Sequence, residues 1–69
     1  MTKEDKKFLE EEIAQVKKAL RSIGYQYNFW QQRASLSNKQ DDMQQFANVT
    51  GTKRGTEEYV KYLEELLAK

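Results

Sequence analysis

Apolar residues recur along the first half of this chain at intervals of four and three residues. The series keeps its phase for more than three heptads and comprises Leu9, Ile13, Val16, Leu20, Ile23, Tyr27, Trp30 and Ala34. Such intervals place side chains on one face of an α-helix, as in a coiled coil. The spacing therefore predicts one long helix over about residues 3–34, roughly 47 Å long at 1.5 Å per residue.

Gly24 lies inside this series and is the weakest point of the predicted helix. A glycine in a helix interior costs about 1 kcal/mol relative to alanine. The apolar spacing nevertheless continues across Gly24 without a change of phase, which favours a continuous helix. The alternative is a break, in which Gly24 ends a first helix after Ile23.

The second half of the chain predicts two shorter helices, over about residues 39–50 and 56–68. Gly51 is expected to end the first of them in a left-handed conformation. Residues 51–55 then form a turn, and Thr56 caps the last helix.

Together these two helices approach the length of the first one. We therefore expect an all-α fold in which a single domain, residues 1–69, folds the two shorter helices back along the long one. This arrangement is a hairpin-like three-helix bundle. The chain lacks proline, and its 33% charged and 38% hydrophobic residues lie in the globular range.

The chain contains neither Cys nor His, which excludes disulfides and Cys/His zinc sites. Its tandem acidic residues, such as Glu57 and Glu58, diverge by about 100° on a helix and do not converge on one proton or metal ion. We therefore expect no enzyme, no cofactor and no metal site. A core this small supplies roughly 3–5 kcal/mol, so stability depends on well-packed helices, self-association or a partner.

The longest apolar runs are two or three residues, so the sequence predicts no membrane span and no membrane partner. The charged residues near the start do not resemble a secretory signal. These features favour a small cytoplasmic protein. Its compact size and its independence of metal ions and disulfides suit a protein encoded by a phage or mobile element.

Phe8, Tyr25 and Phe29 fall outside the apolar series, and Phe8 and Phe29 share a rotational position because they are three heptads apart. Aromatic residues and arginine dominate binding hot spots. We therefore predict a non-enzymatic helical module (an adaptor, inhibitor or assembly factor) that binds a protein partner or a second copy. The predicted interface comprises Tyr25, Phe29, Trp30 and Arg33.

A nucleic-acid-associated protein is the alternative prediction. Residues 13–40 contain five cations and no acid, namely Lys17, Lys18, Arg21, Arg33 and Lys39. The candidate contacts are Lys17, Lys18, Arg21, Lys53 and Arg54, the last two in the turn over residues 51–55. This alternative is second because the net charge is only +1 and the last predicted helix is acidic. A helix-turn-helix motif is disfavoured, since Thr52 and Glu57 occupy positions that are usually aliphatic.

Overall fold

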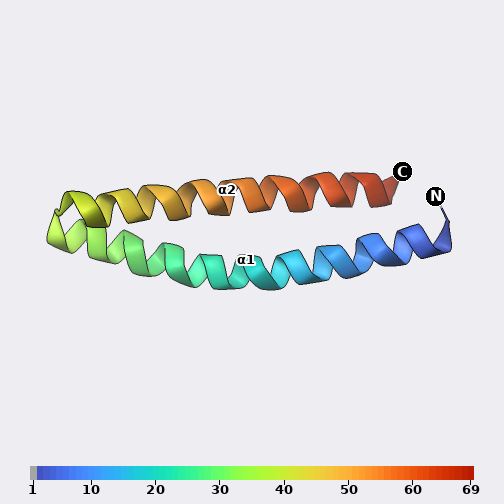
Figure 1. The fold of residues 1–69 in the computed structure, drawn as a ribbon, viewed down its shortest axis with the longest axis horizontal. Helices are drawn as coiled ribbons and strands as arrows, with labels where there is room; N and C mark the ends of the chain where they lie inside the picture. Colours follow the sequence, from blue (N-terminus) through green and yellow to red (C-terminus); the bar gives the residue numbers. More distant parts are fainter. Residues whose placement is uncertain (1) are drawn as a thin grey trace.

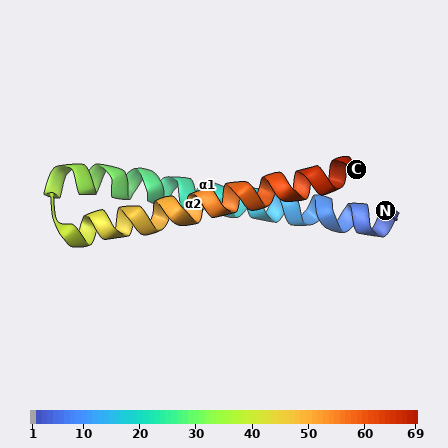
Figure 2. The ribbon, with the colours of Figure 1, turned by 90° about the horizontal axis from the view of Figure 1, so that it is seen from above.

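The computed structural model describes residues 2–69, which form two α-helices joined by a two-residue loop. Helix α1 spans Lys3–Ser37 and helix α2 spans Gln40–Ala68. The helices lie antiparallel and side by side as a hairpin measuring 51 × 15 × 13 Å (Figure 1). Both chain ends lie at one end of this rod, the open end, and the loop lies at the other (Figure 2).

Helix α1 confirms the long helix that the apolar spacing predicts, and it continues three residues beyond residue 34. The Thr2 hydroxyl caps its start by accepting a hydrogen bond from the Asp5 backbone N–H, with 3.1 Å between the heavy atoms. The helix passes through Gly24 without interruption, so the alternative of a break there is wrong. It ends at Asn38, whose left-handed conformation (φ 55°, ψ 18°) turns the chain toward α2.

The second half of the chain forms one helix instead of two. The predicted helices over 39–50 and 56–68 merge into α2, and the predicted turn over 51–55 is helical. Neither Gly51 nor Gly55 has a positive φ. The prediction of a three-helix bundle is therefore wrong, and the protein is a two-helix hairpin.

Packing against α1 explains why α2 continues through its glycines. Eight of the ten less exposed side chains of α2 recur every four and three residues along its whole length: Asp42, Phe46, Val49, Lys53, Thr56, Val60, Leu63 and Leu67. Lys53 and Thr56 keep the phase of this series although they are polar. Two interior glycines cost about 2 kcal/mol in helix propensity, and burial of one continuous helix face offsets that cost.

The threonines of this segment also fit a helix. The hydroxyls of Thr50, Thr52 and Thr56 each donate a hydrogen bond to the backbone carbonyl four residues earlier, over 2.7–3.1 Å. Each hydroxyl therefore has a hydrogen-bond partner within α2. Thr56 lies inside the helix and does not cap a helix start as the sequence predicts.

Contacts between the helices occur along the whole hairpin. They join Arg33 with Asp42 and Tyr27 with Phe46 toward the loop, and Lys17 with Glu64 and Glu12 with Tyr59 toward the open end. The core is thin, because two helices leave most of each surface uncovered. Among residues 2–69, the buried apolar side chains are Ile13, Val60 and Leu63, which are 5–8% exposed.

Candidate protein-interaction face

The heptad pattern divides the surface of the hairpin into two broad faces. We number Ile13 of α1 and Phe46 of α2 as position a, so that the two apolar series occupy positions a and d. In an antiparallel pair of helices, the two sets of g positions lie side by side, and so do the two sets of e positions. The hydrogen bond between Tyr59 and Glu12, both at g, agrees with this geometry. Positions g and c therefore form one face, and positions e and b form the opposite face.

Large apolar side chains gather on the face formed by positions g and c, which we name the apolar face. Among residues 2–69, seven large apolar side chains are between 45% and 86% exposed. Five of the seven lie on the apolar face: Phe8, Phe29, Leu36, Tyr59 and Tyr62. Of the other two, Tyr25 occupies position f on the outer edge of α1, and Met43 occupies position e on the opposite face.

The middle of the apolar face is free of charge. Every c and g residue between Glu12 and Arg33 on α1 is uncharged, and so is every c and g residue between Asp41 and Lys69 on α2. Over the same length, the e and b face carries Lys17, Arg21, Arg54, Glu57, Lys61 and Glu64. The two faces of the hairpin therefore differ in charge over this length.

The predicted interface residues separate into two groups. Phe29, Trp30 and Arg33 form a cluster in which the two rings meet edge to face, with 5.0 Å between their centres. The Arg33 guanidinium carbon lies 5.7 Å from the centre of the Trp30 ring, within the range of a cation–π interaction. Tyr25 does not join this cluster. It is 77% exposed and lines a separate depression beside Gly24.

A polar network connects Arg33 to the loop. Asp42 is only 8% exposed, and its carboxylate accepts a hydrogen bond from the Ser37 hydroxyl over 2.6 Å. The Arg33 Nε lies 3.4 Å from the other carboxylate oxygen. The Ser37 hydrogen bond is the main cause that holds the pKa of Asp42 below its ordinary value of 3.8, and the Arg33 charge adds to it. A polar residue at a core position of the heptad favours one register of the helices.

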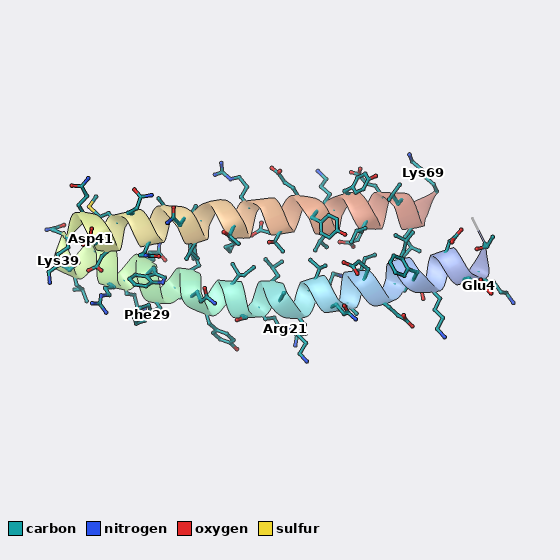
Figure 3. The ribbon with its side chains drawn as sticks, viewed as in Figure 1. Glu4, Arg21, Phe29, Lys39, Asp41 and Lys69 are labelled. Atoms are coloured by element: carbon teal, nitrogen blue, oxygen red, sulfur yellow. The ribbon has the colours of Figure 1, made fainter. Side chains whose placement is uncertain are left out.

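The predicted nucleic-acid contacts lie away from the apolar face. Arg21 projects from α1 away from α2 (Figure 3) and lines a depression together with Lys53 and Tyr27. The Lys53 ammonium lies 5.2 Å from the centre of the Tyr27 ring and 2.5 Å from a carboxylate oxygen of Glu57. The hydrogen bond to Glu57 is the main cause that raises the pKa of Lys53. Arg54 lines a neighbouring depression that also contains Tyr27 and Lys53.

The remaining candidate cations are dispersed along the rod. Lys17 lies 3.9 Å from Glu64 across the helix pair, and Lys18 occupies position f on the outer edge of α1. Because residues 51–55 are helical, Lys53 and Arg54 diverge by about 100° around α2. They therefore do not share the turn that the sequence predicts for them.

Tyr59 and Tyr62 are absent from the predicted interface, although they contribute two of the five exposed apolar side chains of the apolar face. The signal that assigns them is the heptad phase of α2. Lys53 and Thr56 are polar, but they occupy buried positions of the series. Only with these two residues included does the heptad phase extend from Phe46 to Tyr59 and Tyr62.

Among residues 2–69, no cluster of three or more Asp, Glu, His or Cys side chains is arranged to hold a metal ion. No helix in this part of the chain is long and apolar enough to cross a membrane. No family model matches the chain, and no curated protein or solved structure matches it.

Proposed function

We propose that this protein is a non-enzymatic helical binding module that acts through its apolar face. The observation that carries the proposal is the placement of five of the seven exposed large apolar side chains on one face whose middle is uncharged. Over the middle of the hairpin, six charged residues lie on the e and b face and none on the apolar face. Uncharged surfaces rich in aromatic residues are typical of protein interfaces.

The cluster of Phe29, Trp30 and Arg33 supports the same proposal. Its arginine is held in place from both sides, by the Trp30 ring and by the Asp42 carboxylate. A side chain that is already ordered loses less conformational entropy when a partner binds. Phe29 and Leu36 line a shallow depression beside this arginine, which offers an apolar anchor site for a partner side chain.

Site-specific photo-crosslinking tests the proposal. A photoreactive phenylalanine derivative replaces Tyr62 on the apolar face or, as the matched control, Tyr25 on the outer edge. Both tyrosines are more than half exposed, and the control position Tyr25 is the more exposed of the two, so low accessibility does not explain a missing adduct there. After irradiation in an extract of the native host, we expect a covalent protein adduct from position 62 and little from position 25. Absence of an adduct at position 62, or equal adducts at the two positions, would contradict the proposal.

Nucleic-acid binding through the opposite face is the second candidate function. It is favoured by the proximity of Arg21 on α1 to Lys53 and Arg54 on α2, because these cations line two depressions around Tyr27. Replacement of Arg21 and Arg54 by glutamine should abolish any retardation of RNA or DNA at low salt. The apolar-face substitution Tyr62→Ser should leave such binding intact. If the unmodified protein retards neither RNA nor DNA at low salt, this candidate is excluded.

A further inference from the structure

We propose that the apolar face is covered by a second copy of this chain in antiparallel orientation, which forms a four-helix bundle. This inference rests on the proposed function and names the partner of that same face. In the dimer, the loop end of one copy lies beside the open end of the other. The two α1 helices then face each other, and so do the two α2 helices.

The surface area of the single hairpin supports association. Its solvent-accessible surface is 5679 Å², whereas a compact monomer of 8.2 kDa exposes about 4,500 Å². The broad face of the rod, 51 Å by 15 Å, covers roughly 770 Å², close to the 800 Å² or so that each partner buries in a standard interface. Contact over this one face would therefore bury most of the surface area that the hairpin exposes beyond a compact monomer.

The distribution of charge selects the antiparallel orientation. The loop half of the hairpin, residues 22–55, contains four cations and two acids, for a net charge of +2. The open half, residues 1–21 and 56–69, contains eight cations and nine acids, for a net charge of −1. Glu4 and Lys69 mark the open end in Figure 3, and Lys39 and Asp41 mark the loop end. An antiparallel dimer places opposite charges together, whereas a parallel dimer places like charges together.

A single two-fold axis at mid-length also matches individual residues. Ser22 on α1 and Gly55 on α2 both occupy position c and lie at the same level in the register of the hairpin. Ser22 is midway in sequence between Phe8 and Leu36, so an axis there brings Phe8 of one copy opposite Leu36 of the second copy. Small side chains at the axis allow the helices to approach closely.

The same axis pairs the charged residues that flank the uncharged middle of the apolar face. It brings Glu12 of one copy opposite Arg33 of the second copy on α1. Gly55 is midway between Asp41 and Lys69, so it also brings Asp41 opposite Lys69 of the second copy on α2. Each of these four residues thus meets an opposite charge, and the two-fold symmetry forms every pair twice.

Sedimentation equilibrium of the purified protein tests whether the dimer exists. We expect a mass of twice 8.2 kDa at high micromolar concentration. The substitution Tyr62→Glu should weaken the dimer by more than about tenfold because it introduces a charge into the apolar face of both copies. The control substitution Tyr25→Glu on the outer edge should leave the dimer unchanged. A monomer at these concentrations, or equal effects of the two substitutions, would overturn the proposal.

Charge reversal tests the pairing without altering the apolar side chains. Lys69→Glu should weaken the dimer severalfold by placing a like charge opposite Asp41 of the second copy. Adding Asp41→Lys in the same chain should restore the affinity, because the pair is then reversed on both sides. If the double variant binds no more tightly than Lys69→Glu alone, the proposed axis is wrong.

Spin labels test the orientation. The chain contains no cysteine, so Lys39→Cys provides one label at the loop of each copy. In the antiparallel dimer, the two labels should be separated by about the length of the rod, 51 Å. In a parallel dimer they would lie about one helix spacing apart, roughly 10 Å plus the label linkers. A short distance would overturn the antiparallel arrangement.

These outcomes separate the inference from the proposed function. If the protein sediments as a monomer but position 62 crosslinks to a different protein, the proposed function stands and the dimer proposal is wrong. If the protein is monomeric and forms no adduct at position 62, both proposals are wrong.

Discussion

The hydroxyl of Ser37 donates a 2.6 Å hydrogen bond to the carboxylate of Asp42 across the loop that joins the two helices. This bond is the main cause of the lowered pKa of Asp42. Because the pKa is lower in the folded chain than in the unfolded one, ionised Asp42 stabilises the hairpin above pH 3.8, and this stabilisation is lost as the pH falls through the folded-state pKa.

Substitution of Ser37 by alanine should therefore raise the pKa of Asp42 toward 3.8 and reduce the loss of stability on acidification. A titration of the side-chain carboxyl resonances by NMR measures the pKa directly. Ser35→Ala is the matched control, because the Ser35 hydroxyl bonds the Gln31 carbonyl within α1 and does not reach Asp42. An Asp42 pKa that is the same with and without the Ser37 hydroxyl would contradict this account.

Gly51→Ala should stabilise the protein by about 1 kcal/mol, since alanine has the higher helix propensity. A Cβ atom at Gly51 would meet nothing within 4 Å. Urea denaturation followed by circular dichroism measures the change. If residue 51 were instead a left-handed helix terminus, the same substitution would destabilise the protein, so the sign of the effect distinguishes a continuous α2 from two shorter helices.

Asn38 is the one residue other than glycine that has a positive φ among residues 2–69. Asn38→Ala should destabilise the hairpin by up to about 1–2 kcal/mol, because the short polar side chain of asparagine tolerates the left-handed conformation, whereas that of alanine does not. Asn38→Gly should preserve or increase stability, since glycine adopts this conformation freely. Equal stability of the two variants in thermal unfolding would show that the loop does not depend on this conformation.

Leu63→Ala should destabilise the protein by about 2–3 kcal/mol, near the lower end of the range for buried leucines, because the thin core leaves room for neighbouring side chains to relax. Leu63 is 5% exposed. Met43→Ala serves as the control, since Met43 is 54% exposed and lies on the face opposite the apolar face. Chemical denaturation of the two variants should give clearly different midpoints.

The sequence predicts α1 well because nothing in its apolar series conflicts with helix geometry. Gly24 is the exception, and there the unchanged phase of the series correctly predicts a continuous helix. Helix α2 is harder to predict, because Gly51 and Gly55 favour a turn in local terms while Lys53 and Thr56 interrupt the apolar pattern. Contact with α1 decides whether residues 51–56 form a helix or a turn. The sequence of these residues alone does not reveal that contact.

The candidate site could be predicted only in part for the same reason. Phe29, Trp30 and Arg33 are neighbours on one helix, so their spacing alone brings them together. Tyr59 and Tyr62 join the apolar face through the pairing of α2 with α1, which depends on the register and not on spacing along one helix. Tyr25 lies on the outer edge of α1 and not on the apolar face, although it is only four residues from Phe29 in the sequence.

The chain enters and leaves the hairpin at the same end of the rod (Figures 1 and 2). A hairpin with this layout can be grafted into a surface turn of an unrelated host protein, where it would stand out as a spur whose tip lies as much as 51 Å from the host. The loop at the tip would then be free for an epitope or a label. The fold thus offers a compact spacer whose two attachment points are already adjacent.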